Sequence, residues 1–201
     1  SVNTVYAQLV TQLGPKAAIE AVARYGIASP LEPFPSAVLG ANSVTPLDMA
    51  SAYSTLANRG TRVPPTFVTR VVGRDGRVIY EHAEAGRPVL STEVADTVTA
   101  ILEQAMHRGT GRRAVIGRPA AGKTGTAQEW RDAWFAGYTP DLTTVVWVGF
   151  PEGQVSMQPP ATPIRVTGGS WPAQIWQRFM TRALAGVAPR PFVAPPPGAL
   201  P

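Results

Sequence analysis

The sequence has 201 residues, which is enough for one hydrophobic core or two small lobes but short for a multidomain enzyme. Hydrophobic residues make up 44% of the chain and charged residues 15%, which excludes general disorder. The absence of cysteine excludes disulfide scaffolds and thiol catalysis, and two histidines are too few for an ordinary histidine metal centre. We therefore expect chemistry without a metal or cofactor. The net charge of +5 comes mostly from dispersed arginines, so nucleic acid is not an expected partner.

No apolar stretch of the sequence is long enough to span a bilayer, and the first ten residues lack the features of a signal peptide. Ser1 already stands at the start of a helical pattern. We therefore expect the chain to begin inside a larger protein.

The first part of the chain is predicted to be helical. Apolar residues recur at helical spacing over 4–24 and are interrupted at Gly14, which predicts two short helices joined by a turn. Thr45 is a typical N-cap and is followed by a proline, so we predict a helix over 45–58 that ends before Gly60.

The middle of the chain combines a hairpin and a helix. Two runs rich in β-branched residues, 67–72 and 77–80, flank a turn at Asp75-Gly76 and predict an antiparallel hairpin. A capped helix is predicted to follow over 91–108.

Three consecutive strands are predicted over 122–128, 133–138 and 143–150, with a turn between the last two. A final helix begins at Trp171, and we expect four of its side chains to share one buried face. These side chains are Ile175, Trp176, Phe179 and Met180. We expect residues 1–186 to form the folded portion and the proline-rich residues 187–201 to form an extended tail or linker.

The tetrad Lys123-Thr124-Gly125-Thr126 at the head of a predicted strand has the chemistry of a carboxylate receptor. Lys123 supplies positive potential, and Thr124 and Thr126 supply hydroxyl donors. Gly125 lets a substrate lie close to the backbone of the strand edge. A Lys-Thr-Gly sequence also arises by chance in turns, so the tetrad alone is a modest signal.

Ser1-x-Asn3 precedes the first predicted helix, where serine and asparagine usually serve as caps. The same pair followed by a distant Lys-Thr-Gly resembles the second and third motifs of the penicillin-recognising serine enzymes, whose set is Ser-x-x-Lys, Ser-Asp-Asn and Lys-Thr-Gly.

The resemblance extends over nearly the whole chain in order and spacing. Further segments look like their counterparts in bifunctional (class A) penicillin-binding proteins. These segments are 45–53, 109–111, 131–141, 146–150 and 167–176. The resemblance implies an α/β fold of α+β type, with helices packed on an antiparallel sheet, as in the serine β-lactamases.

This resemblance also implies an activity and a location. A D,D-transpeptidase forms a serine acyl-enzyme with the penultimate D-Ala of a peptidoglycan stem peptide, and β-lactams mimic the D-Ala-D-Ala end. The family further implies an upstream glycosyltransferase domain, an N-terminal membrane anchor in the parent protein and an extracytoplasmic location.

The resemblance assigns roles to particular residues. Ser1 would relay a proton during acylation, and Asn3 would hold the substrate amide and the lysine of the first motif. Lys123 would supply positive potential, and the substrate carboxylate would accept hydrogen bonds from Thr124 and Thr126. The Thr126 backbone N–H would be one of two oxyanion-hole donors.

The first motif of the family, Ser-x-x-Lys, does not occur in these 201 residues. The two lysines are Lys16 and Lys123, and the positions three residues before them hold Leu13 and Ala120. We therefore expect the nucleophile to lie outside this chain, in an upstream part of the same protein, and the chain alone to be inactive.

Two other functions remain open from the sequence. One is a serine β-lactamase or D,D-carboxypeptidase of the same fold, and the other is an inert module that has lost the nucleophile. Among other residues, we expect His82 and His107 to lie at the surface or in caps, and Trp134 and Trp147 to lie in the core. Glu129 or Trp130 borders the cleft in this interpretation, and Asp132 has no catalytic role.

Overall fold

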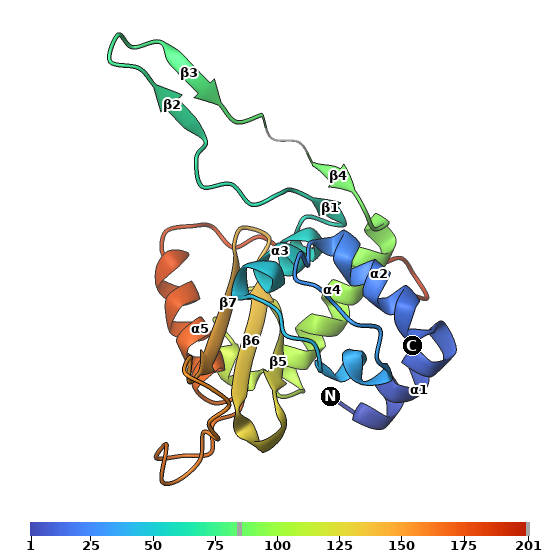
Figure 1. Cartoon of the computed structure of the whole chain (residues 1–201). Coiled ribbons are helices and arrows are strands. Elements are labelled where there is room, and N and C mark those ends of the chain that lie inside the picture. The colour runs from blue at the N-terminus through green and yellow to red at the C-terminus, as the bar shows by residue number, and fades with distance from the viewer. Residues whose placement is uncertain (84–85, 200–201) are drawn as a thin grey trace.

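The centre of the molecule is a three-stranded antiparallel sheet (Figure 1). The computed structural model describes residues 1–83 and 86–199. The strands are β5 (Ala121–Thr126), β6 (Asp132–Tyr138) and β7 (Thr143–Gly149), in the order β5-β6-β7. The three predicted strands are thus confirmed, with ends that differ by at most two residues.

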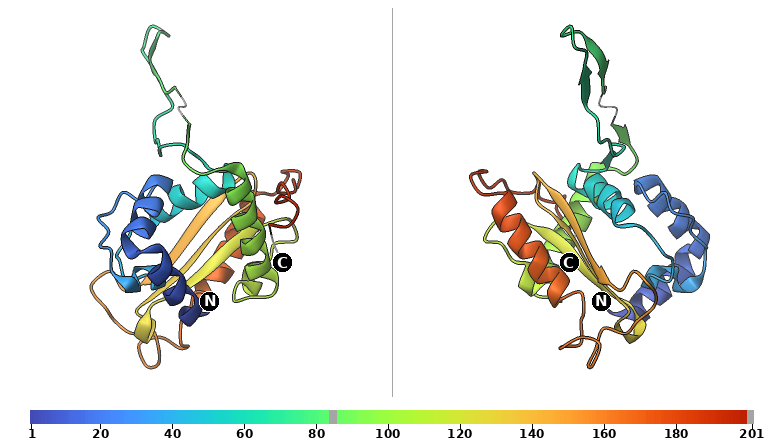
Figure 2. Two further views of the ribbon diagram at one scale, coloured as in Figure 1. Left: turned by 90° about the vertical axis from the view of Figure 1, so that its right-hand side faces the viewer. Right: turned by 60° about the vertical axis from the view of Figure 1, so that its left-hand side comes forward.

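Helices cover both faces of this sheet (Figure 2). On one face lies α5 (Trp171–Ala183), whose Trp176 is fully buried against Phe135 with ring centroids 5.2 Å apart. The indole N–H of Trp176 also donates to the Thr144 carbonyl at 3.0 Å. On the opposite face lies α3 (Pro46–Ala57), while α4 (Thr92–His107) packs along β5.

Of the four side chains of α5 that were expected to be buried, two are buried and two are exposed. Trp176 and Met180 are fully buried, as predicted, but Ile175 and Phe179 are 46% and 51% exposed. The apolar residues of α5 therefore cover a wider arc than the part that touches the sheet. Among the helices of the described residues, none is both long and apolar enough to cross a bilayer.

The N-terminal lobe consists of short helices joined by turns. The helices α1 (Asn3–Leu13) and α2 (Pro15–Tyr25) confirm the predicted pair, and the 3-10 turn η1 (Pro35–Leu39) leads to α3. A capping box at the start of α3 confirms Thr45 as its N-cap, because the Thr45 hydroxyl accepts from the Asp48 N–H at 3.1 Å.

A long hairpin projects from the body of the molecule (Figure 1). Its base is β1 (Thr61–Arg62) paired with β4 (Arg87–Pro88), and its outer part is β2 (Arg70–Val72) paired with β3 (Val78–Glu81). The predicted hairpin is confirmed, although β2 is shorter than the predicted 67–72 and β3 lies one residue later than the predicted 77–80. Every residue of β2 and β3 is exposed, so both faces of this ribbon are in contact with solvent.

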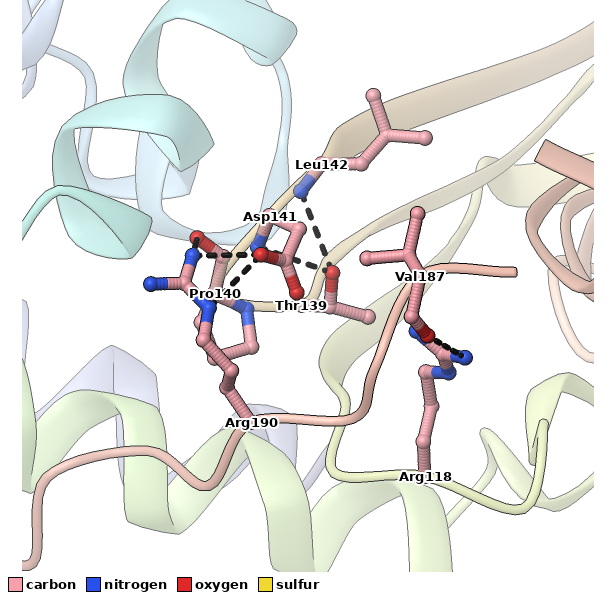
Figure 3. Close-up of polar contacts among 7 residues, drawn as sticks. All are labelled: Arg118, Thr139, Pro140, Asp141, Leu142, Val187 and Arg190. Carbon is pink, nitrogen blue, oxygen red and sulfur yellow. Dashed lines mark hydrogen bonds and ion pairs between the residues drawn. The ribbon is translucent and has the colours of Figure 1, made fainter. Parts of the chain in front are cut away.

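The proline-rich C-terminal segment begins against the body (Figure 3). The Arg118 guanidinium donates to the Val187 carbonyl at 2.8 Å, and the Arg190 guanidinium donates to the Asp141 carboxylate at 2.8 Å. The Phe192 ring meets Tyr138 edge-on, with centroids 5.6 Å apart. Residues 200 and 201 of the predicted tail lie outside the described residues, and its boundary at residue 187 stays a prediction.

The predicted surroundings of the isolated aromatic and histidine residues are met in part. Trp134 and Trp147 are only partly buried, so their placement in the core was wrong; their rings lie 6.3 Å apart on the sheet. The Trp147 indole N–H donates to Asp132 at 2.8 Å, which gives that carboxylate a structural role. His107 is exposed in the last turn of α4, as expected.

Candidate active site

Lys123 is the charged centre of the candidate site. Its position in the middle of β5, opposite Ala136 of β6, leaves its side chain partly buried. Burial lowers the pKa of the Lys123 ammonium. Its hydrogen-bond acceptors are neutral: the Ser1 hydroxyl and, at 2.9 Å, the Thr124 carbonyl.

Ser1 lies beside Lys123 although 122 positions separate them in the sequence. The capping interpretation of Ser1 and Asn3 does not hold, because the N-cap of α1 is Val2 and no side chain caps this helix start. Since Ser1 Oγ accepts the bond from Lys123, its own proton is free for another acceptor. The arrangement can thus transfer a proton between a hydroxyl group and a lysine.

Asn3 is the first residue of α1 and is exposed. Within the described residues its side chain makes no hydrogen bond, so the structure brings Ser1, but not the Asn3 amide, into contact with Lys123. Because consecutive Cα atoms are about 3.8 Å apart, the Cα atom of Asn3 lies within about 8 Å of that of Ser1.

The two threonines of the tetrad have hydroxyl groups held by neighbouring loops. Thr124 shares a hydrogen bond of 2.5 Å with Thr110, which follows α4. The Thr126 hydroxyl accepts the Gly168 N–H at 3.0 Å, which leaves its own hydrogen available for a ligand. Since Thr126 is exposed, the end of β5 offers a hydroxyl donor to solvent.

Two residues that support the site were not among the predicted site residues, Thr110 and Gly168. A β-carbon on Gly168 would lie 2.5 Å from the Gly125 carbonyl oxygen and 2.4 Å from that of Trp134, so only glycine fits there. In the sequence, Thr110 and Gly168 could be noticed only as members of the Thr-Gly pairs at 110–111 and 167–168. Their contacts with β5 depend on long-range packing, which the sequence pattern does not reveal.

The described residues contain no cluster of three or more acidic, histidine or cysteine side chains suited to a metal ion. The groups that β5 does offer are the Lys123 ammonium, in contact with the Ser1 hydroxyl, and the hydroxyl groups of Thr124 and Thr126 further along the strand. Such a set can bind a carboxylate and stabilise developing negative charge.

Comparison with known proteins relates this geometry to a family. A family model described as the penicillin-binding protein transpeptidase domain matches residues 1–158. The chain belongs to this family. It is 36% identical over 219 residues to penicillin-binding protein 1A of Mycobacterium tuberculosis, covering 97% of this chain and 27% of that protein. It is 32% identical to penicillin-binding protein 1B of Escherichia coli, covering 98% of this chain and 22% of that protein.

Solved penicillin-binding proteins share the fold. PonA1 from Mycobacterium tuberculosis superposes with a TM-score of 0.88 and 35% identity over 96% of this chain and 57% of that chain. The same values hold for PonA1 in complex with penicillin V. Penicillin-binding protein 1A from Haemophilus influenzae has a TM-score of 0.82 at 22% identity and supports the fold alone.

These matches confirm the predicted family, the transpeptidase domain of class A penicillin-binding proteins. They also confirm the predicted α/β fold with an antiparallel sheet flanked by helices. The chain spans about a quarter of the length of the curated relatives. The roles of individual residues in the penicillin-binding transpeptidase site stay predictions.

Proposed function

We propose that this chain carries about half of the active site of a serine D,D-transpeptidase that cross-links peptidoglycan. The observation that supports this most directly is the contact between the Lys123 ammonium and the Ser1 hydroxyl at β5. The two groups lie 122 positions apart in the sequence, and Lys123 has no carboxylate partner in the described residues, so this contact is not part of an ion pair.

In this proposal the stem peptide ends at the Lys123 tetrad. The terminal carboxylate lies in the potential of Lys123 and accepts hydrogen bonds from the Thr124 and Thr126 hydroxyls. The carbonyl of the penultimate D-Ala points at the Thr126 N–H, and Gly125 allows the peptide to approach the strand.

Ser1 and Asn3 complete this half of the site. Because burial lowers the pKa of Lys123, a proton passes more readily between the lysine and the Ser1 hydroxyl during acyl transfer. The Asn3 amide at the start of α1 holds the amide of the substrate. β-Lactams resemble the D-Ala-D-Ala end and bind to the same groups.

The nucleophile comes from an upstream part of the same protein. The 201 residues contain no Ser-x-x-Lys, and serine attack requires an activating base. We propose further that the parent protein carries a glycosyltransferase domain, is anchored by an N-terminal transmembrane helix and works on the outer side of the membrane.

The test is acylation by a fluorescent penicillin, followed on a denaturing gel and by intact mass. We expect a single covalent adduct on the full-length protein encoded by the same gene and none on the 201-residue chain. In the full-length protein, Lys123→Ala should lower the acylation rate by about 100-fold, as for loss of other charge-stabilising groups. Lys16→Ala, which removes the exposed lysine that pairs with Glu20, is the matched control and should acylate normally.

Three results would count against the proposal. Adduct on the 201-residue chain would place the nucleophile among its own residues. A full-length protein that forms no adduct would be an inert module, and one that rapidly releases hydrolysed penicillin would be a β-lactamase.

A further inference from the structure

The turn between β5 and β6 holds two consecutive residues in an unfavourable backbone conformation. Glu129 and Trp130 have φ angles of 56° and 54°, in the left-handed region that non-glycine residues rarely adopt. The turn is fixed from outside: the Ser156 hydroxyl donates to the Glu129 carbonyl at 2.5 Å, and the Met157 N–H donates to the Trp130 carbonyl at 2.9 Å. Strain held in place by such contacts is typical of functional sites.

The turn presents the Trp130 ring to a cation. The Arg165 guanidinium lies over the ring, with its central carbon 4.1 Å from the ring centroid. Arg165 is exposed and forms neither a hydrogen bond nor an ion pair through its side chain in the described part of the chain. It is therefore a positioned cation without an acidic partner there.

Arg165 and Trp130 both lie near the end of the strand that carries the tetrad. Trp130 follows Thr126 through a single short turn, and Arg165 precedes Gly168, whose N–H donates to the Thr126 hydroxyl. The Val166 N–H donates to the Met157 carbonyl at 2.8 Å, which ties the Arg165 segment to the one that holds Trp130.

The stacking leaves the binding groups of Arg165 free. A guanidinium held over an aromatic ring is attracted by the face of the ring and does not use its N–H donors for a hydrogen bond there. These donors match the two oxygens of a carboxylate, and the stacked side chain loses less conformational freedom on binding. Arg165 is thus suited to recognise a carboxylate.

The direction of the substrate follows from the proposed function, on which this inference rests. A peptide whose terminal carboxylate lies at Lys123 and whose penultimate carbonyl lies at Thr126 runs antiparallel to β5. An extended peptide advances about 3.3 Å per residue, so the residue before D-Ala-D-Ala lies one step beyond Thr126, toward the turn in which the Trp130 N–H donates to the Ala127 carbonyl at 3.2 Å.

We infer that Arg165, positioned by Trp130, is a specificity residue that binds a carboxylate on the residue preceding the D-Ala-D-Ala end of the stem peptide. The acyl side chain of a β-lactam corresponds to this preceding residue. A carboxylate on that side chain therefore brings a negative charge to the part of the site that Arg165 borders. Arg165 thereby selects acidic over neutral acyl groups.

The test compares two penicillins with the full-length protein. Penicillin V has an uncharged acyl side chain, and carbenicillin has a carboxylate on it. The measured quantity is the ratio of the second-order acylation rate for carbenicillin to that for penicillin V. We expect Arg165→Gln to lower this ratio about tenfold, as for loss of one charged hydrogen-bonded pair. Arg178→Gln, which removes an exposed arginine of α5, should leave the ratio unchanged.

The outcomes separate the inference from the proposed function. An Arg165→Gln ratio within twofold of the wild-type ratio would overturn the inference while the proposed function stands. If neither penicillin acylates the wild-type protein, the proposed function fails and the inference fails with it. If Arg165→Gln reacts with neither penicillin, Arg165→Lys replaces it; a lowered ratio supports the role of the planar guanidinium, and an unchanged ratio contradicts it.

Discussion

Two charged residues of this chain, Lys123 and Asp48, lose contact with water on folding. The surroundings of Lys123 favour its neutral form, whereas those of Asp48 favour its charged form. The acceptors around Lys123 are neutral oxygens, so burial lowers its pKa without a compensating negative charge. Burial alone would raise the pKa of Asp48, but hydrogen bonds from Ser29, Ala28 and Thr45 outweigh it and lower the pKa to about 2. The first environment favours proton transfer, whereas the second holds a carboxylate permanently charged for a structural purpose.

The hydrogen bonds to the Asp48 carboxylate predict that Asp48→Asn lowers the stability of the fold in a pH-dependent way. The carboxylate accepts the Ala28 N–H at 2.8 Å and the Ser29 hydroxyl at 2.5 Å, and these bonds tie the loop after α2 to the start of α3. We expect the substitution to lower the free energy of unfolding by about 2 kcal/mol at pH 7, the range of hydrogen bonds to a charged group.

The sign of the pH dependence follows from the depressed pKa. The unfolded carboxyl titrates near 3.8 and the folded one near 2, so its stabilisation is full above pH 4 and is lost as the pH falls through this window. Urea unfolding at pH 7 and pH 2 measures this. Glu152→Gln, which changes an exposed carboxylate, is the control. An equal cost of Asp48→Asn at both pH values would contradict the assignment.

At the scale of elements, the C-terminal segment contacts one end of the central sheet, where β5 begins and where β6 turns into β7. Arg118 lies just before β5 and donates to the Leu184 and Val187 carbonyls. Arg190 contacts the turn between β6 and β7, and Figure 3 shows this contact together with the one from Arg118 to Val187. The segment therefore crosses the same end of the sheet at two points. Its proline-rich composition is compatible with this because the extended backbone offers unpaired carbonyls to arginine donors.

Phe192→Ala tests how much this segment stabilises the sheet. The Phe192 ring packs on Tyr138, which is fully buried, and Tyr138 in turn shares a hydrogen bond of 2.8 Å with Thr99 of α4. We expect a loss of about 2 kcal/mol in the free energy of unfolding, below the range for a fully buried phenylalanine since this ring is partly exposed.

The neighbouring Val193→Ala is the matched control, because Val193 is 50% exposed and should cost less than about 0.5 kcal/mol. Thermal unfolding followed by circular dichroism gives both values. Equal small effects of the two substitutions would mean that the segment rests on the sheet without stabilising it.

For the whole molecule, the sequence predicts what depends on neighbours along the chain. The helix beginning at Thr45 and the hairpin turn at Gly76 carry local signals, and both are confirmed. The arrangement around the site depends on contacts between distant residues, such as Gly168 with Thr126, and family resemblance rather than periodicity brought Ser1 and Lys123 together. For the same reason the pattern of α5 did not reveal which apolar residues touch the sheet.

The projecting hairpin divides the molecule into a stable body and a ribbon that depends on it. Neither face of β2 or β3 is buried, and a two-stranded ribbon has little stability of its own in water. Backbone amides of β2 and β3 should therefore exchange with solvent much faster than those of β6, most of whose residues are buried.

Shortening the hairpin should leave the body folded. The His82 N–H donates to the Thr69 carbonyl at 2.8 Å, so the two arms are adjacent there and an Asn-Gly turn can replace residues 70–81. We expect the midpoint of thermal unfolding to stay within about 2 °C of the wild-type value, because the removed residues bury little surface against the body. A fall of more than about 5 °C, measured by circular dichroism, would show that the ribbon contributes to the stability of the body.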